Sequence, residues 1–347
     1  MRIGLTFNVR SAAGRPPSPA QAPTGPLPTD DAEEEFDAPE TIEGIAAVLR
    51  SLGNEVDLLG DGEPLLRRLL DGPRPDWVFN FAEGTGIGRS REARVPAVLE
   101  MLGIPYSGSD PLTLAVTLDK EVAKRLVRDA GVPTPEWLLV DDESLAAARR
   151  TLTEQKLAAL PLPVIVKPAF EGSSKGVFSA NLLHDRAQLL DTVARLHRDY
   201  RQPILVEEFI DGDELTVGLI GNPPEVFGIM QVVPTQPQTG PFVYSLEVKR
   251  DWERLVRYVC PAPLSAGDTS AVRKAAVDSW RALGCRDFSR IDFRLRRGVP
   301  YFLEVNPLPG LNPKSSDLVL MAKALGISYA KLIERIVRAA TKRMFGD

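Results

Sequence analysis

Residues 288–310, FSRIDFRLRRGVPYFLEVNPLPG, constrain the fold most, because two strand-like apolar runs flank a glycine that can turn the chain. The spacing predicts an antiparallel hairpin whose turn centres on Gly298. This turn places Asp292 directly opposite Glu304. Residues two apart in a strand share a face, so Asn306 is expected beside Glu304. The hairpin therefore presents three oxygen-bearing side chains together.

The neighbouring Leu303 and Val305 are expected on the opposite face of this hairpin. Adjacent carboxylates repel each other unless one is protonated or a cation lies between them. Two carboxylates and an amide suit Mg²⁺, with water and phosphate completing its octahedron. The alternative is the solvated outer face of an edge hairpin, and spacing alone leaves both interpretations open.

The composition indicates a soluble globular chain: 347 residues, 44% hydrophobic and 26% charged, are enough for two or three domains. A net charge of −5 argues against broad nucleic-acid or membrane binding. Cys260 and Cys285 form no disulfide framework or zinc motif, and two histidines exclude a His-rich zinc site. The apolar runs are too short for a membrane span or a signal peptide. We therefore expect a cytoplasmic protein with neither nucleic-acid nor membrane partners.

The pattern predicts an α/β chain in three parts: 1–112, 113–206 and 207–347, the last of α+β character. The first part alternates strands and helices, which favours a parallel sheet. Within it, the Pro-rich and acidic segment 11–35 is expected to be mobile, either as a disordered insertion or as a lid over an active site. The expected helices cover 40–52, 64–70, 119–130, 142–159, 185–200, 269–283, 316–325 and 329–341. The expected strands, besides the hairpin, cover 2–8, 55–59, 76–82, 137–140, 162–168, 176–183, 203–210, 214–220 and 225–233.

A second motif, VIVKPAFEGSSKGV, places Lys167 at the end of an apolar strand and follows it with a glycine- and serine-rich loop. Exposed amide groups and hydroxyls can hold phosphate oxygens, and the lysine supplies a point charge. Such a loop is more often a simple turn than a binding site. It matches neither the P-loop nor the dinucleotide fingerprint.

A third motif, LVEEFIDGDELTV, ends an apolar strand in Glu207, Glu208 and Phe209. Successive side chains point to opposite faces, so only one of the two glutamates can enter a cleft between sheets. A carboxylate and backbone polar groups at a strand end suit the edge of a base and a ribose. An edge strand with protective charges is the alternative.

The ordered combination is far more specific than its members: KPxxxGSSxG, VEEFIxGxE, RID and LEVNPxPG. It resembles the ATP-grasp ligases, and among them most closely the D-alanine–D-alanine ligase family, from about Trp77 onward. The resemblance implies an ATP-grasp fold with an N-terminal Rossmann-like pre-ATP-grasp domain. It also implies an ATP-dependent, ADP-forming enzyme that joins small-molecule carboxylate and amine substrates through an acyl phosphate, and a homodimer.

Site residues are carried over position by position. The residues implied for the ATP phosphates are Lys120, Lys167, Ser173, Ser174 and Gly176. Those implied for adenine and ribose are Glu207, Glu208, Phe209, Ile210 and Glu214. Asp292, Glu304 and Asn306 are implied to bind two Mg²⁺ ions, which Mn²⁺ can replace. The residues implied to take part in catalysis are Arg290, Lys249, Gly310 and Ser173.

The amino-acid binding motifs of the family are not matched. The family's N-terminal Gly-rich stretch is replaced by the Pro-rich segment, and its His-Gly motif by NFAEGTGIGRSREA. A ligase for another amino acid or a similar acid is therefore favoured over an authentic D-alanine–D-alanine ligase. An ATP-grasp phosphotransferase and a nucleotide-binding protein without catalysis stay as alternatives. The candidate substrate contacts are Glu83, Arg91, Glu92, Lys314 and Ser315.

Overall fold

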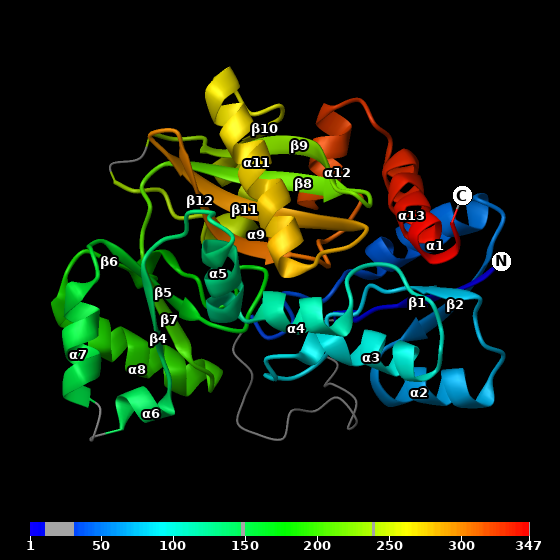
Figure 1. Ribbon diagram of the computed structural model, residues 1–347, viewed down its shortest axis with the longest axis horizontal. Coiled ribbons are helices and arrows are strands. Elements are labelled where there is room, and N and C mark those ends of the chain that lie inside the picture. The colour runs from blue at the N-terminus through cyan, green and yellow to red at the C-terminus, as the bar shows by residue number, and fades with distance from the viewer. Residues whose placement is uncertain (11–30, 147–149, 238–239, 347) are drawn as a thin grey trace.

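The computed structural model describes residues 1–10, 31–146, 150–237 and 240–346. These residues form three β-sheets, and Figure 1 shows the C-terminal sheet above the N-terminal and central sheets. Each sheet packs its apolar side chains against helices. The mixed helix and sheet content agrees with the predicted α/β class.

The N-terminal sheet is parallel, as the alternating pattern predicts. Its order is β2-β1-β3, with β1 at Arg2–Thr6, β2 at Glu55–Gly60 and β3 at Trp77–Phe79. Helices α1 (Pro39–Ser51) and α2 (Gly62–Asp71) connect these strands. Both helices lie within two residues of the bounds expected from their apolar spacing.

Three helices connect this sheet to the central part: α3 (Arg94–Met101), α4 (Pro111–Leu118) and α5 (Lys120–Asp129). The pattern missed α3 and α4. Asp119 caps α5, because its side chain accepts hydrogen bonds from the amides of Glu121 and Val122. The cap fixes Lys120 in the first turn of α5.

The central sheet is antiparallel, in the order β4-β7-β5-β6, and packs on helix α8. The pattern predicts all four strands, but β6 is much shorter than the expected 176–183, because Ser179–Asn181 form a 3₁₀ segment and the strand is limited to Leu182–Leu183. The bounds are β4 Trp137–Val140, α6 Asp142–Leu145, α7 Arg150–Ala159, β5 Val164–Pro168, β6 Leu182–Leu183, α8 Leu189–Tyr200 and β7 Ile204–Glu208.

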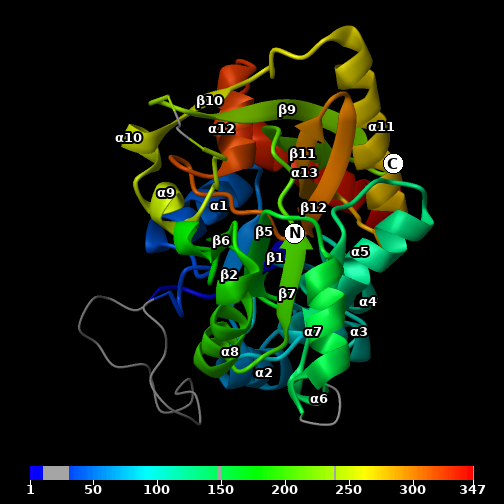
Figure 2. The ribbon, with the colours of Figure 1, turned by 90° about the vertical axis from the view of Figure 1, so that its left-hand side faces the viewer.

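The C-terminal sheet has the order β10-β9-β8-β11-β12. Helix α11 covers one face of the sheet and α12 covers part of the other, as Figures 1 and 2 show. The packing side chains include Val272 and Ala276 on α11, and Leu318 and Met321 on α12. The rest of that second face stays open toward the central sheet. The strands are β8 Asp213–Ile220, β9 Glu225–Pro234, β10 Val256–Val259, β11 Phe288–Arg296 and β12 Val299–Asn306. The helices are α9 Leu246–Arg250, α10 Trp252–Leu255, α11 Ala266–Leu283, α12 Asp317–Ala324 and α13 Tyr329–Phe345.

At the two carboxylates, the register of the β11–β12 hairpin is as predicted, with Asp292 opposite Glu304. The turn differs, because Arg297 and Gly298 form a two-residue loop with φ of 53° and 77°. A bulge between Asp292 and Phe293 then restores the expected pairing. The bulge also turns Leu303 toward the same hollow as Glu304, so its expected place on the opposite face was wrong.

Candidate functional site

Two adjoining hollows lie where the three sheets meet. The first, of about 930 Å³ to its open mouth, lies between the central and C-terminal sheets. The second, of about 670 Å³, lies toward the N-terminal part. Their common wall contains Lys120, Glu171, Arg290 and Glu304.

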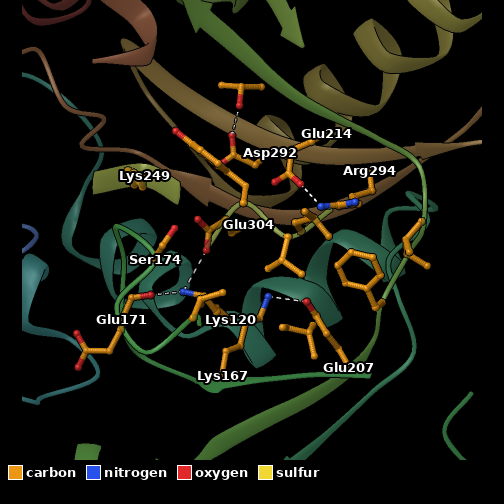
Figure 3. A pocket seen from close by; sticks show the side chains of 18 of the residues that line it. Lys120, Lys167, Glu171, Ser174, Glu207, Glu214, Lys249, Asp292, Arg294 and Glu304 are labelled. Atoms are coloured by element: carbon orange, nitrogen blue, oxygen red, sulfur yellow. Dashed lines mark hydrogen bonds and ion pairs between the residues drawn. The ribbon is translucent and has the colours of Figure 1, made fainter. Parts of the chain in front are cut away.

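Two lysines and a glutamate from the central part form a buried cluster. Lys167 and Glu207 line the first hollow (Figure 3), while Lys124 pairs with Glu207 but does not line the hollow. The Nζ atom of Lys167, on β5, lies 2.5 Å from Oε1 of Glu207, on β7. Lys124 Nζ lies 2.8 Å from Oε2 of the same glutamate. Burial opposes ionisation of Glu207, but the two lysines outweigh it and lower its pKa. Burial lowers the pKa of Lys124 to about 8, although Glu207 opposes the shift.

The end of β7 and the start of β8 bring the candidate adenine and ribose residues together. Phe209 and Ile210 are buried and line the first hollow with Glu208 and Glu214. The Arg294 guanidinium lies 4.5 Å from the centre of the Phe209 ring and pairs with Glu214. These contacts hold an aromatic ring and a carboxylate on one side of the hollow.

The hairpin carboxylates face the lysine cluster across the hollow, as Figure 3 shows for Asp292 and Glu304. Glu304 Oε2 lies 3.2 Å from Lys120 Nζ. Burial opposes ionisation of Glu304, but Lys120, Lys167 and Arg290 outweigh it and lower its pKa to about 2. Burial, with Glu304 adjacent, raises the pKa of Asp292 to about 6 although Arg290 opposes the shift.

Arg290 is held by two acids: its Nη2 lies 3.0 Å from Asp292 Oδ2, and its Nη1 lies 2.8 Å from Asp317 Oδ2. Burial lowers the pKa of Lys249, which also lines the first hollow, and nearby Arg290 adds to the shift. The hollow therefore holds two cations beside the hairpin carboxylates.

Asn306 and the two hairpin carboxylates form the candidate metal site. Asn306 Nδ2 lies 3.4 Å from Asp292 Oδ2, and Thr216 Oγ1 donates a hydrogen bond to Asp292 Oδ1 at 3.0 Å. Across the part of the chain that the structure describes, no cluster of three or more His, Cys, Asp and Glu side chains suits a metal. The donor set of two opposed carboxylates and one amide oxygen nevertheless fits a hard cation that also binds nucleotide phosphates.

The glycine- and serine-rich loop after β5 is anchored by the acidic segment 31–37. Gly172 N donates to Glu35 Oε1 at 2.5 Å, and Gly176 N donates to Asp31 Oδ2 at 3.0 Å. Ser173 and Ser174 have positive φ angles of 49° and 61°, which is strained for serine. Ser174 lines the first hollow and Ser173 the second.

Arg91 is buried and faces Glu35 and Glu171. Its Nη2 lies 2.6 Å from Glu35 Oε1, and its Nη1 donates to the carbonyl of Phe170 at 2.6 Å. Burial opposes ionisation of Glu35, but Arg91 and Lys175 outweigh it and lower its pKa to about 2. Arg91 therefore binds the loop and lines neither hollow.

The second hollow is acidic and contains Glu83 and Glu92. Burial raises the pKa of Glu92 to about 8 although Arg91 opposes the shift. Burial and then Glu92 raise the pKa of Glu83 well above its ordinary value. Burial also raises the pKa of Asp37 to about 7, although Arg10 opposes the shift.

Most residues proposed from the sequence line one of the two hollows, Asn306 and Gly310 among them. Gly176 lines neither but anchors the loop. Lys314 and Ser315 are exposed and line neither hollow. Sequence reasoning missed Asp317, for which no local signal exists. It also missed Lys124, although that residue lies one helical turn after Lys120, a spacing that could have revealed it.

Comparisons with known proteins agree with this arrangement. A family model described as "D-ala D-ala ligase C-terminus" matches residues 126–338. An uncharacterized protein, y4sG, of Sinorhizobium fredii is 37% identical over 88% of each chain. A D-alanine–D-alanine ligase of Fervidobacterium nodosum is 31% identical, covering 86% of this chain and 93% of its own.

The fold agrees with a crystal structure of the Bacillus anthracis D-alanine–D-alanine ligase complexed with ATP, which has a TM-score of 0.70 and 23% identity. That match covers 100% of this chain and 99% of the other. The fold and the cleft between its sheets define an ATP-grasp enzyme, as the sequence motifs predict. Within that class, the chain belongs to the D-alanine–D-alanine ligase family and is an ATP-dependent ligase of that type.

None of the described helices combines the length and apolarity needed to cross a lipid bilayer. The predicted ATP and Mg²⁺ dependence agrees with the family.

Proposed function

We propose that this ligase joins a carboxylate to an amine through an acyl phosphate and releases ADP and phosphate. The observation that carries the proposal is the common wall of the two hollows, with Lys120, Arg290 and Glu304. A nucleotide in the first hollow and a carboxylate in the second meet at this wall. The acidic lining of the second hollow suits a substrate that carries an amine.

The first hollow is proposed to take ATP. The residues proposed for its phosphates are Lys120, Lys167, Ser173, Ser174 and Gly176. Those proposed for its base and sugar are Glu207, Glu208, Phe209, Ile210 and Glu214. Support comes from Lys120, Lys167 and the Phe209 ring, which all line the hollow. Lysines supply point charges for phosphate, and an apolar ring suits a base.

The hairpin is proposed to hold two Mg²⁺ ions through Asp292, Glu304 and Asn306. Bound there, a divalent cation supplies positive charge to the phosphate oxygens. Lys120 forms an ion pair with Glu304, which offsets part of the negative charge of the hairpin.

The reaction begins when a substrate carboxylate oxygen attacks the γ-phosphorus of ATP and ADP leaves. The amine then attacks the acyl carbon, loses a proton, and expels phosphate. Arg290 and Lys249 stabilise the charge of the transferred phosphoryl group. The Gly310 amide and the Ser173 hydroxyl are proposed to face the tetrahedral oxyanion from the second hollow. The loop excludes water that otherwise hydrolyses the intermediate.

The acid substrate is proposed to be an amino acid or a similar acid. Curated relatives named D-alanine–D-alanine ligase support this class. The candidate contacts are Glu83 and Glu92, which line the second hollow. Arg91 is paired with Glu35, and Lys314 and Ser315 lie outside both hollows, so these three are weaker candidates.

The domain division at 112 and 206 and the lid role of 11–35 stay proposals. Residues 11–30 lie outside the described part of the chain. A cytoplasmic location is supported by the need for ATP and by the free thiols of Cys260 and Cys285. A homodimer rests on the family resemblance alone, and light scattering after size-exclusion chromatography tests it.

Product analysis tests the proposed function. Purified protein is incubated with ATP, Mg²⁺ and pairs of amino acids, each acid with and without an amine partner. Ligation predicts equal amounts of ADP, free phosphate and amide, all dependent on both substrates. A phosphotransferase instead leaves the phosphate on its substrate, and that product contradicts the proposal. The Asp292→Asn variant is the inactive control.

A further inference from the structure

The second hollow contains more carboxyl groups than cationic partners for them. Three of its carboxylates have cationic partners: Glu35 pairs with Arg91, Glu171 with Lys175 at 2.5 Å, and Glu304 with Lys120. The other carboxylates of the lining are Asp37, Glu83 and Glu92. The ion pairs of the described residues include none of these three.

Glu92 is the most informative of the three. It is only 7% exposed, yet within the described ranges it makes no side-chain hydrogen bond or ion pair. It lies in the 3₁₀ segment Arg91–Ala93, where Arg91 binds Glu35 while Glu92 lines the second hollow. A buried carboxylate without a partner costs several kcal/mol, so a ligand that neutralises it binds strongly.

Glu83 lines the same hollow and approaches Glu92 closely enough to repel it. It too has no side-chain partner among the residues that the structure places. Asp37 contacts Thr41 and completes the acidic lining. A cation bound beside these three groups favours their ionised forms. Their number leaves room for a second cation besides the α-ammonium group of an amino acid.

The cations of the hollow are already engaged. Lys120 pairs with Glu304, and Arg290 pairs with Asp292 and Asp317. Among the described residues that line this hollow, no cation is left for an anionic side chain. An acidic amino acid is therefore disfavoured by the same lining that favours a basic one.

We infer that the acid substrate is a basic amino acid, whose side-chain nitrogen binds between Glu83 and Glu92 while its carboxylate faces the common wall. The inference rests on the proposed function and names the class of its acid substrate. A preference for basic amino acids distinguishes this chain from an enzyme that uses alanine, because alanine carries only the positive charge of its α-ammonium group. A site built for a charged group rejects the analogue that lacks it, here on the order of 100-fold or more.

Calorimetry with the full chain, Mg²⁺ and a non-hydrolysable ATP analogue tests the inference. The probes are both enantiomers of lysine and ornithine, with norleucine and norvaline as isosteres that lack the nitrogen, plus alanine and glutamate. We expect lysine or ornithine to bind about 100-fold more tightly than its isostere. Equal affinity for both members of each pair, or no binding of any basic amino acid, overturns the inference.

Two variants assign the effect to the hollow. Glu92→Gln and Glu83→Gln are each expected to weaken the binding of lysine or ornithine more than that of its isostere, so that the preference falls below about tenfold. A purely structural role weakens all probes equally. Glu43→Gln, at an exposed carboxylate paired with Arg50, is the matched control. An unchanged preference in both Glu83 and Glu92 variants overturns the assignment.

Turnover separates this inference from the proposed function. Phosphate release with neutral acids only, and none with basic ones, overturns the inference and leaves the ligase intact. Preferential binding of lysine or ornithine without phosphate release from any acid–amine pair overturns the ligase and supports the cationic site.

Discussion

Replacement of Glu35 by glutamine tests how the acidic segment holds the loop of the nucleotide site. The Glu35 carboxylate accepts from Gly172 N at 2.5 Å and pairs with Arg91 at 2.6 Å and with Lys175 at 3.4 Å. Its side chain is only 5% exposed. Glutamine keeps the shape but removes the charge. Among the ion pairs of the described residues, Arg91 then keeps the one with Glu171, which is more distant at 3.4 Å.

Two independent arguments give the size of the effect. Removal of one partner of a buried ion pair costs about 3–5 kcal/mol. The gap between the pKa of about 2 in the folded protein and the ordinary 4.5 corresponds to about 3 kcal/mol. Because the folded pKa is the lower one, this stability is present above pH 4.5 and is lost as the pH falls toward 2.

Thermal unfolding measures this loss. With an unfolding entropy of about 2.1 cal/mol/K per residue, a 347-residue chain loses about 4–7 °C in Tm for that energy. The control Glu43→Gln removes an exposed ion pair with Arg50, worth less than about 1 kcal/mol, so its Tm falls by less than about 1.5 °C. Equal shifts in the two variants refute the anchoring role of Glu35.

Three further predictions concern the nucleotide site. Asp292→Asn and Glu304→Gln each abolish phosphate release with little change in far-UV circular dichroism, and full activity in both rejects the metal assignment. Gly176→Ala raises the KM for ATP and lowers stability by about 2–4 kcal/mol, because the new Cβ meets Pro168 Cγ at 2.5 Å and φ is +69°. The control is Gly60→Ala, because Gly60 has a similar φ of +68° but no atom lies near the position of the new Cβ. Calorimetry is expected to show a stability loss of only about 1–2 kcal/mol for this variant. Lys249→Met is expected to lower kcat by a larger factor than it raises the KM for ATP. An unchanged kcat excludes a role of Lys249 in phosphoryl transfer.

The β11–β12 hairpin shows how much local pattern predicts. The alternation of apolar and polar residues, together with the turn glycine Gly298, predicted the pairing of Asp292 with Glu304. Both signals depend only on residues close in sequence. The bulge was not predictable, since it depends on how β12 packs on its neighbours. The consequence was a wrong face for Leu303.

The contacts of the acidic segment were not predictable from sequence. Asp31 and Glu35 bind a loop about 140 residues away, and no periodicity encodes such a distance. The run of acids indicated only that the segment could not build a core. Tertiary structure instead buries both side chains against backbone amides.

Arg91 and Glu92 show the same limit for the site. Both were candidates for substrate contacts, because they lie in the stretch NFAEGTGIGRSREA that replaces the family's His-Gly motif. The 3₁₀ segment turns Arg91 toward Glu35 and leaves Glu92 beside the second hollow. Sequence identified the pair, and only the fold assigns each residue its partner.

The acyl phosphate is the central claim, and oxygen labelling tests it most directly. An acid substrate labelled with ¹⁸O in its carboxylate is incubated with ATP, Mg²⁺, an amine and the protein, and the released phosphate is analysed by mass spectrometry. Activation by phosphorylation predicts that one labelled oxygen per turnover appears in the phosphate. Unlabelled phosphate, released while the amide forms, contradicts the account.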